Sequence, residues 1–303
     1  MSVLQFTKLE LKHIPLIKPF FEMQQRRLCD CTIGSTMMWR DYFDNCFVIE
    51  EDTLVFRSRY LDGKYAFTFP IGPHAEWMLD RVEQYCKEKE IDLEFCTVTP
   101  FDLDALKARW SDAEVEENRD WFDYLYESQK IVEFSGKKYA AQRNHINRFE
   151  RDYPDWSFER MGAENVEEGR AFFLELIEQR SKEGDTAREE EEKVFEVFDH
   201  FKEYGFLGGL LRVQGKIVGL SMGEIVRDTL FVHIEKANTE LSGVYQKLVQ
   251  CFAREFVNED VLYINREEDV GDPGLRKSKM SYRPLKLLEK YTVRVNLTNG
   301  GNL

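Results

Sequence analysis

The sequence predicts a protein of the α+β class, built from mixed sheets that carry helices on both faces. Two observations lead to this prediction. Strand-like runs, which alternate apolar and polar residues, come in groups of three between segments with the apolar spacing of amphipathic helices. The order of these segments in the first half, β-α-α-β-β-β-α-β-α-β, also returns in the second half. Residue identity between the halves is slight, so what repeats is the order of elements.

In the first half, each expected element is a run of residues bounded by turn-forming positions. Alternation predicts strands at residues 6–11, 46–50, 53–60, 64–70 and 93–98. Apolar spacing predicts helices at residues 14–23, 36–43, 76–89 and 102–110. Gly72 and Pro73 mark the turn before the third of these helices. Residues 114–126 are expected to be extended in part.

In the second half, the same patterns predict a matching set of elements. Strands are expected at residues 156–160, 206–213, 217–226, 229–235, 261–264 and 285–295. Helices are expected at residues 166–182, 188–204 and 244–256, with a helical turn at 275–279. A chain of 303 residues fits two domains of roughly 150 residues each. We therefore expect a first domain at residues 1–122, a bridging segment at 123–155 and a second domain at 156–303.

Composition and charge restrict the class of protein. The net charge is -14, which favours solubility and disfavours unspecific attraction to nucleic acid or anionic lipid, while a local basic groove is compatible with it. No apolar stretch approaches the roughly 18 residues that a membrane-spanning helix needs. The first residues also lack the apolar run of a secretory signal. We therefore expect a soluble cytoplasmic protein.

The cysteines and histidines do not predict a metal site. The six cysteines and five histidines are scattered through the chain, and no two cysteines form a Cys-x-x-Cys pair. Zinc sites usually need two such pairs, or one pair with spaced histidines. We expect no structural metal and interpret the cysteines as core or surface thiols.

A charged loop within residues 263–294 is the strongest candidate for a functional site. It follows a short apolar strand and is interrupted by two glycines and Pro273. Its ionisable side chains include Arg266, Glu267, Glu268, Asp269, Arg276, Lys277 and Lys279, and Tyr282, Arg283 and Pro284 close it. Loops held by a rigid scaffold often carry binding and chemistry. A solvated charged turn is the alternative.

The residue types of this loop suggest distinct roles. Arg266 and Arg276 can bind a carboxylate or a phosphate with two parallel hydrogen bonds, and Lys279 belongs to the same substrate-binding group. Asp269 can hold a cationic amine, because opposite charge keeps a carboxylate ionised. Tyr282 either donates a proton to a leaving oxygen or packs in the core. Asp269 and Tyr282 are therefore the catalytic candidates.

Two glutamates extend the substrate-binding set. Glu224 and Glu235 end strands that are expected near the centre of the second sheet. A carboxylate in that position needs a partner, so either side chain can face a substrate cleft. A surface position at the edge of the sheet is the alternative.

The basic segment at residues 137–151 is the second informative stretch. On a helix, Arg143, Asn147 and Arg151 share one face by i, i+4 spacing. The candidates for contact with a phosphate or a nucleic acid are Lys137, Lys138, Arg143 and His145. His145 is interpreted as a surface or hydrogen-bonding histidine, with a general base as the alternative. The alternative for the whole segment is a bridging helix whose arginines pair with the surplus carboxylates.

Three stretches of the sequence resemble one family. They are Asp123-Tyr124-Leu125-Tyr126 with Phe134-Ser135-Gly136-Lys137-Lys138-Tyr139, then Arg143-Asn144-His145-Ile146-Asn147-Arg148-Phe149, and finally residues 263–269 with 274–279 and 282–284. On these stretches, the chain resembles a branch of soluble proteins related to the carboxy-terminal domain of phosphatidylglycerol lysyltransferase, and it is also similar to the Fem-type aminoacyl transferases. The resemblance implies a tandem GNAT-like acyltransferase fold. It covers most of the chain from about Asp123 onward, whereas the earlier residues match only in the order of elements.

One feature of acyl-coenzyme A enzymes with the GNAT fold is missing. Those proteins carry a Gln/Arg-x-x-Gly-x-Gly/Ala turn, whose backbone N–H groups hold the pyrophosphate at a helix N-terminus. The corresponding residues 240–245 and 69–74 keep only Gly243 and Gly72, and Pro73 removes one donor. We therefore expect no coenzyme A site and no other cofactor. Ser242 is expected to be a plain N-cap of the helix that follows it.

The resemblance implies transfer of an aminoacyl group from aminoacyl-tRNA to an amine or hydroxyl acceptor. Positioning in a cleft between the domains, with polarisation of the carbonyl by backbone N–H groups, would drive such a reaction. The lipid acceptor is not implied, because the phosphatidylglycerol enzymes carry a membrane-spanning portion and this sequence has none. The alternatives are an acetyl-CoA-dependent N-acetyltransferase and a non-catalytic ligand-binding protein that retains the fold.

Overall fold

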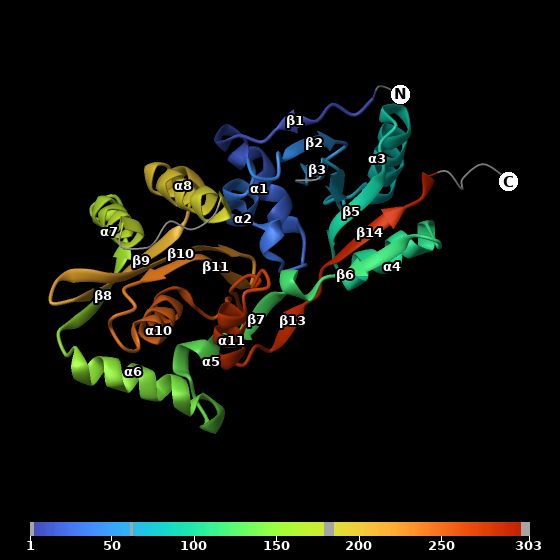
Figure 1. Cartoon of the computed structure of the whole chain (residues 1–303). Helices are drawn as coiled ribbons and strands as arrows, with labels where there is room; N and C mark the ends of the chain where they lie inside the picture. The colour runs from blue at the N-terminus through green and yellow to red at the C-terminus, as the bar shows by residue number, and fades with distance from the viewer. Residues whose placement is uncertain (1–2, 61–62, 179–184, 298–303) are drawn as a thin grey trace. The chain divides into compact units, whose positions relative to one another are not determined.

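The chain folds into two compact units, each built around a mixed sheet. The computed structural model describes residues 3–60, 63–178 and 185–297. The first unit comprises Met1–Phe122 with Leu288–Leu303, and the second comprises Asp123–Leu287. Within the described residues each unit contains one seven-stranded sheet, with helices packed against it (Figure 1). The predicted α+β class is confirmed.

In the first unit, the strands lie in the order β1-β2-β3-β4-β5-β14-β6. Their bounds are β1 Thr7–Lys8, β2 Cys46–Glu50, β3 Thr53–Arg59, β4 Tyr65–Thr68, β5 Leu93–Val98, β6 Glu114–Glu117 and β14 Tyr291–Val295. The neighbouring pairs are antiparallel, except that β4 and β5 are parallel. A parallel pair needs a crossover connection, and helix α3 (Ala75–Lys89) supplies it.

The helices of the first unit present apolar residues at helical spacing to the sheet. The remaining bounds are η1 Leu11–His13, α1 Ile14–Met23, η2 Cys29–Cys31, α2 Ile33–Met38, α4 Pro100–Arg109 and η3 Arg119–Trp121. On α3, the buried residues Met78, Val82 and Cys86 lie about one turn apart. They pack in one core with Phe67 of β4 and Phe95 of β5. Burial of this stripe holds α3 on the sheet.

In the second unit, the strands lie in the order β13-β7-β12-β11-β10-β9-β8. Their bounds are β7 Asp123–Glu127, β8 Trp156–Met161, β9 Leu207–Val213, β10 Lys216–Val226, β11 Thr229–Ala237, β12 Tyr263–Asn265 and β13 Lys286–Leu288. The pair of β11 and β12 is parallel, while β12 and β7 are antiparallel. Helix α10 (Val244–Phe256) makes the crossover from β11 to β12.

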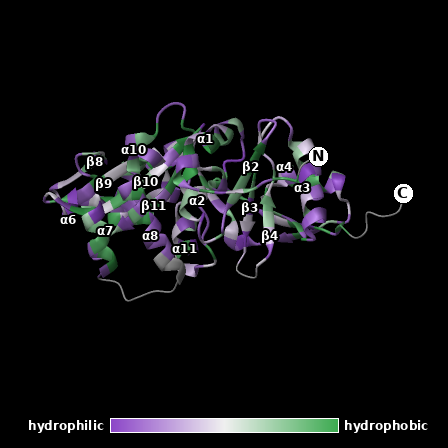
Figure 2. Ribbon diagram, turned by 90° about the horizontal axis from the view of Figure 1, so that it is seen from above, coloured by the Kyte–Doolittle hydropathy of each residue, from purple (hydrophilic) through white to green (hydrophobic). Residues whose placement is uncertain are grey.

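Helices cover both faces of the second sheet. The remaining bounds are α5 Ser128–Glu133, η4 Lys137–Tyr139, α6 Ala140–Asp152, α7 Val166–Glu178, α8 Asp185–Asp199, α9 Phe201–Tyr204 and α11 Pro273–Ser281. Leu211 of β9 packs in a core with Leu248 of α10. The preceding Leu210 points to the opposite face, where it lies against Gly169 of α7. The helices show both hydrophilic and hydrophobic segments in Figure 2, as expected for helices with one covered face.

The two sheets share one strand order, and the sixth position of each is filled by a strand that is out of sequence order. β1 to β5 correspond in position to β8 to β12. The sixth position is filled by β14 in the first sheet and by β7 in the second. The strand expected at residues 285–295 is therefore wrong as a single element, because β13 and β14 belong to different sheets. Alternation continues through these residues, so the pattern could not show the change of sheet.

The units also divide the chain differently from the expectation. The segment at residues 123–155, expected to bridge two domains, supplies β7, α5, η4 and α6 to the second unit. The residues from Leu288 onward lie in the first unit. Pairing between distant strands decides both assignments, and a local sequence pattern does not contain that information.

Several predicted elements differ from the structure at their ends. The strand expected at 6–11 is shortened to β1 and is followed by η1, and the helix expected at 36–43 is α2, which ends at Met38. The helix expected at 188–204 consists of α8 and α9, with His200 between them. The last residues of the helix expected at 166–182 lie outside the described residues, where α7 is described to Glu178.

A candidate active site in the second unit

The candidate site begins where β11 and β12 stop pairing. Their parallel register ends at Phe231 and Asn265. Beyond this point the chain continues its pairing with β7: the Arg266 amide donates to the Tyr124 carbonyl, and the Tyr124 amide donates to the Glu267 carbonyl, both at 3.1 Å. The Glu267 amide also donates to Asn265 Oδ1 at 2.7 Å. These bonds hold Glu267 at a φ of 56°, a conformation that a non-glycine residue rarely adopts.

A β-bulge places His233 at the same level of the sheet. Met222 pairs with Ile234 and Gly223 pairs with Val232, so His233 is the extra residue of β11. A Cβ at Gly223 would lie 2.0 Å from the Phe231 carbonyl oxygen, so the bulge needs glycine there. The His233 ring stacks on Phe231, with ring centroids 6.4 Å apart. The bulge thus points the imidazole at the residues that follow β12.

His233 lies between two carboxylates. Its Nδ1 is 2.7 Å from Glu267 Oε1, and its Nε2 is 3.1 Å from Glu224 Oε1. Burial opposes the charged ring, but the hydrogen bonds to Glu224 and Glu267 outweigh it and raise the pKa of His233 to about 9. The ring is therefore a cation at neutral pH, with both nitrogens donating. It holds the two carboxylates in place and is not free to accept a proton.

Arg266 and Glu235 form the second charged pair of the site. Arg266 donates to Glu235 Oε2 from Nε at 3.1 Å and from Nη2 at 2.5 Å. The guanidinium carbon lies 4.6 Å from the centre of the Tyr282 ring. Ser221 is the cross-strand neighbour of Glu235. Among the described residues, the buried Ser221 Oγ and Arg266 Nη1 make no hydrogen bond, and such atoms are rare in folded proteins.

Asp269 fixes the start of α11 and the position of Arg276. Its carboxylate is buried and accepts from Arg276 Nε at 3.0 Å and Nη2 at 2.6 Å. It also accepts from the Tyr124 hydroxyl at 2.5 Å and from the Gly271 amide at 3.0 Å. Burial alone would raise the pKa of Asp269, but these donors hold it well below its ordinary value. Asp269 is thus an ionised anchor in this structure.

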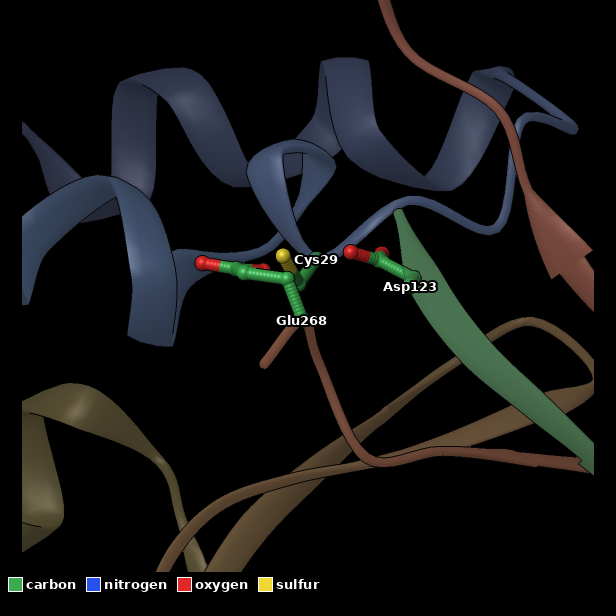
Figure 3. A group of neighbouring side chains, drawn as sticks. All are labelled: Cys29, Asp123 and Glu268. Carbon is green, nitrogen blue, oxygen red and sulfur yellow. The ribbon is translucent and has the colours of Figure 1, made fainter. Parts of the chain in front are cut away.

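A third group surrounds Lys279. Asp123 lies at the start of β7 and Glu268 in the loop after β12 (Figure 3), with carboxylate oxygens within 4.8 Å of each other. Lys279 Nζ donates to the Glu268 carbonyl. Burial lowers the pKa of Lys279, and the charges of Glu267 and Glu268 offset only part of this effect. Carboxylates of this kind can ligate Mg²⁺ or Ca²⁺, but here the lysine ammonium already supplies a cation beside them.

The candidate residues from the charged loop and from β10 and β11 therefore lie in one region of the second unit. These are Glu224, Glu235, Arg266, Asp269, Arg276, Lys279 and Tyr282. Burial raises the pKa of Tyr282 to about 12, so its hydroxyl keeps its proton at neutral pH. Sequence reasoning missed Ser221, His233 and Tyr124 as members. The spacing of His233, two residues before Glu235 on a strand, does not indicate its position, because the β-bulge lies at His233 itself.

The basic candidates lie on other elements. Lys137 and Lys138 are exposed in η4, and the Lys138 ammonium lies 5.2 Å from the centre of the Tyr139 ring. Arg143 of α6 donates to the Phe134 carbonyl and, at 2.6 Å, to the Gly136 carbonyl. It therefore caps the C-terminal end of α5. His145 is exposed on α6.

In each of the two turns that correspond in position to the coenzyme A turn, a backbone carbonyl packs against the glycine. A Cβ at Gly243, before α10, would lie 2.3 Å from the His145 carbonyl oxygen, and a Cβ at Gly72, before α3, would lie 2.4 Å from the Asp52 carbonyl oxygen. A backbone oxygen thus stands close to each turn, where an anion would need N–H donors. The expected N-cap is also corrected: Gly243 takes that position with a φ of 86° and no side-chain hydrogen bond, and Ser242 precedes it.

The strand order of the two sheets defines a class: two-unit α+β proteins of the tandem GNAT-like type. The family model described as "Phosphatidylglycerol lysyltransferase, C-terminal" matches residues 21–294. The chain belongs to this family. No helix among the described residues is long and apolar enough to cross a membrane.

Solved structures show the same fold. A conserved protein of unknown function from Bacteroides thetaiotaomicron is 30% identical, with a TM-score of 0.88 over 97% of this chain and 100% of that chain. L-PGS from Bacillus licheniformis is 14% identical, with a TM-score of 0.63 over 94% of this chain and 93% of that chain. FemX is 8% identical, with a TM-score of 0.63 over 97% and 98% of the two chains. The last two likenesses show the fold alone, and they confirm the predicted fold class.

One curated relative matches part of the chain. An uncharacterised protein of Mycoplasmoides gallisepticum is 26% identical over 200 residues. The match covers 65% of this chain and 63% of the relative, so less than two thirds of that protein's length is represented.

Proposed function

We propose that the chain is an aminoacyl transferase, which moves an aminoacyl group from aminoacyl-tRNA to an amine or hydroxyl acceptor at the polar cluster of the second unit. One observation carries the proposal: two buried polar atoms, Ser221 Oγ and Arg266 Nη1, belong to the residues on either side of Glu235 and make no hydrogen bond within the described residues. A buried donor without an acceptor costs about 1 to 3 kcal/mol. A substrate with a carbonyl oxygen and an ammonium group would satisfy these atoms and Glu235 together.

The charge of the cluster favours a cationic substrate group. Its carboxylates are Glu224, Glu235, Glu267, Glu268, Asp123 and Asp269. Its cations are His233, Arg266, Arg276 and Lys279. The carboxylates outnumber the cations, so the site attracts the α-ammonium of an aminoacyl ester more strongly than a phosphate. Glu235 is the best candidate ligand for that ammonium.

The proposed reaction needs positioning more than a covalent catalyst. The acceptor nitrogen or oxygen attacks the carbonyl carbon of the aminoacyl ester, the bond from that carbon to the ribose oxygen breaks, and the acceptor's proton ends on the ribose oxygen. Arg266 would bind the carbonyl oxygen as its charge grows. Tyr282, which keeps its proton at neutral pH, would donate toward the leaving oxygen. Asp269 would act by holding Arg276, and Lys279 by neutralising the nearby carboxylates.

The tRNA would meet the second unit at its exposed basic segment. Lys137, Lys138 and His145 are exposed there, and phosphate contacts of this kind supply much of the affinity for RNA. The net charge of -14 limits the contact to a small area. A cytoplasmic location, where aminoacyl-tRNA is found, is part of this proposal. An acetyl-CoA-dependent reaction is disfavoured, because backbone oxygens stand against both Gly72 and Gly243.

The test uses the purified full-length chain. Thermal unfolding is followed with a panel of amino-acid amides, which carry the ammonium and the carbonyl but not the tRNA, and with acetyl-CoA. We expect stabilisation by at least one amide, lost in Glu235→Gln and weakened in Ser221→Ala. The matched control is Glu259→Gln, an exposed carboxylate after α10. Ligand binding raises the melting temperature by mass action.

Transfer is then measured with radiolabelled aminoacyl-tRNA and a panel of amines, alcohols and lipid extract. Transfer that follows the amide specificity and is lost in Glu235→Gln supports the proposal. Binding of an amide without transfer to any acceptor would favour the ligand-binding alternative. Stabilisation by acetyl-CoA alone would overturn the proposal in favour of an N-acetyltransferase.

A further inference from the structure

Helix α1 of the first unit carries apolar residues on its outer side as well as on its inner side. Ile17 and Phe20 are among its buried residues. Leu16 and Met23 are 51% and 53% exposed, and Pro19 between them is exposed as well. A surface helix ordinarily has polar residues opposite its buried stripe, and a helix that is apolar on both sides is normally covered. The outer side of α1 therefore has the composition of an interface.

The three exposed apolar residues share one side of the helix. Leu16, Pro19 and Met23 are spaced at i, i+3 and i+7, and each residue turns the helix by about 100°, so they lie within about 60° of one another around its axis. Lys18 and Glu22 are the only charged residues of α1, and both are exposed on the adjoining side, about one turn apart. We call Leu16, Lys18, Pro19, Glu22 and Met23 the α1 face.

The α1 face is complementary to a second copy of itself in the antiparallel direction. With a two-fold axis that crosses the helix near Pro19, Leu16 lies level with Met23 of the second copy, and Lys18 lies level with Glu22 of the second copy. One axis serves both contacts, because the midpoints of the two residue pairs fall within one residue of each other along α1. The axis also places the charged side of α1 beside the charged side of the second copy, and it makes each contact twice. In the parallel direction, like charges would meet.

The charge of the α1 face distinguishes between partners. Its one cation and one anion give it no net charge. Of the cations that flank α1 in the chain, Lys12 pairs with Glu10 and Arg26 pairs with Asp102 within the first unit. A lipid surface or a nucleic acid is bound by an excess of lysine and arginine, which this face lacks. A second copy of the chain needs only the two opposite charges, one turn apart, that the face carries.

We propose that the α1 face binds the α1 face of a second copy of this chain, in the antiparallel direction and with two-fold symmetry. The interface is small, because a stable complex uses about 20 to 30 residues on each side and α1 has ten. The contact is therefore weak, with a Kd on the order of 100 µM. The ion pairs at its edge determine the direction of the contact. The proposal does not depend on the transferase proposal.

The experiment is sedimentation velocity of the full-length chain, from about 10 µM to about 1 mM, a range that brackets such a Kd. We expect the sedimentation coefficient to rise from that of one chain toward that of two. The variant Leu16→Ser with Met23→Ser should weaken the association at least about tenfold, because the apolar contacts are lost. Circular dichroism of each variant checks folding.

Exchange of the two charges is the sharper test. Lys18→Glu alone and Glu22→Lys alone should each weaken the association at least about tenfold, because both ion pairs become contacts between like charges. An equimolar mixture of these two variants should associate as the unaltered chain does, since each variant supplies the charge that the other has lost. The double variant Lys18→Glu with Glu22→Lys should also associate.

A matched control separates local charge from net charge. Lys107→Glu reverses one exposed lysine on α4, and this variant should associate as the unaltered chain does. A single-chain sedimentation coefficient at every concentration would overturn the proposal. Association that the changes at Leu16 and Met23 leave intact would also overturn it, because another surface would then be responsible. Unchanged association in Lys18→Glu or in Glu22→Lys would contradict the antiparallel direction, and so would a mixture of the two that stays monomeric.

Discussion

The two sheets have one strand order but differ at the end of their parallel pairs. After β5, Thr99 caps α4 and bonds Asp102, which accepts from Arg26 Nε at 2.7 Å and Nη2 at 2.8 Å. This group is a closed arrangement of a cap and one ion pair. After β12, three charged groups gather around Arg266, Asp269 and Lys279, and the bulge on β11 adds His233 to them.

The difference teaches that topology does not decide where a site forms. Both parallel pairs end in the same way and both are followed by a loop and a helix, α4 or α11. In the second unit two polar atoms at this level of the sheet, Ser221 Oγ and Arg266 Nη1, are buried without a hydrogen bond within the described residues. The two units therefore differ in a few side chains. In the second unit these are placed by the bulge at His233 and by the positive φ of Glu267, and they form a candidate active site on the shared fold.

The largest loss of stability is expected when β14 or β7, the strands in the sixth position of the two sheets, is disrupted. Val293 of β14 and Leu125 of β7 are buried in the sixth position of the two sheets. An unpaired carboxylate there costs more than about 4 kcal/mol. We expect Val293→Asp to speed hydrogen exchange at β5 amides while sparing β12, and Leu125→Asp to do the reverse. If each variant exposed the amides of both sheets equally, the two units would not be separate folding units.

The next largest loss of stability is expected when either of two buried ion pairs, Asp102 with Arg26 or Asp269 with Arg276, loses its carboxylate. Asp102→Asn and Asp269→Asn each leave an arginine without its carboxylate, so each is expected to lower the free energy of unfolding by about 3 kcal/mol. Chemical denaturation measures this cost. Only Asp269→Asn should also reduce stabilisation by amino-acid amides, because Arg276 then loses its position. Equal loss of ligand binding in both variants would show that destabilisation alone explains the effect.

A smaller, pH-dependent effect is expected at His233. Its folded pKa of about 9 lies above the ordinary value of 6.5, so its contribution is fully present below 6.5 and is lost as the pH rises through about 9. The shift corresponds to about 3 kcal/mol as an upper value. We expect His233→Gln to flatten the fall in unfolding free energy from neutral pH through pH 9. The exposed His145→Gln serves as the control and should keep the slope of the unaltered chain.

The smallest effect concerns the helix caps of the two loops. Thr99 caps α4 by accepting from the Asp102 amide, and Asp272 caps α11 by accepting from the Leu275 amide at 2.5 Å. Replacement of either by alanine should cost about 1 kcal/mol. Differential scanning calorimetry measures both.

Much of the fold could be predicted from the sequence because it depends on local periodicity. The bounds of α1, β2, β5 and α10 agree with the pattern. The exchange of β7 and β14 could not be predicted, because the pairing of strands is a long-range choice that leaves no trace in alternation. The same reason explains why residues 285–295 were interpreted as one strand.

The candidate site shows a similar division. The charged loop is indicated by its residue types and its glycines. In the structure Arg266 bonds Glu235, Arg276 bonds Asp269 and Lys279 bonds the Glu268 carbonyl, although their roles stay predictions. His233 could not be predicted, since its side chain reaches Glu224 and Glu267 only because of the bulge. The bulge in turn depends on the close approach of the Phe231 carbonyl to Gly223, which no spacing rule shows.

The position of β14 in the first sheet also determines which sheet can be completed first during synthesis. Residues 1–122 are translated first, yet β6 pairs only with β14 among the described strands, and the outer edge of β5 is covered by β14. The second unit has all its strands once residue 288 has been made. The unit that is made first is therefore completed last, and the nascent chain carries an open strand edge, prone to wrong pairing, until residue 295 arrives.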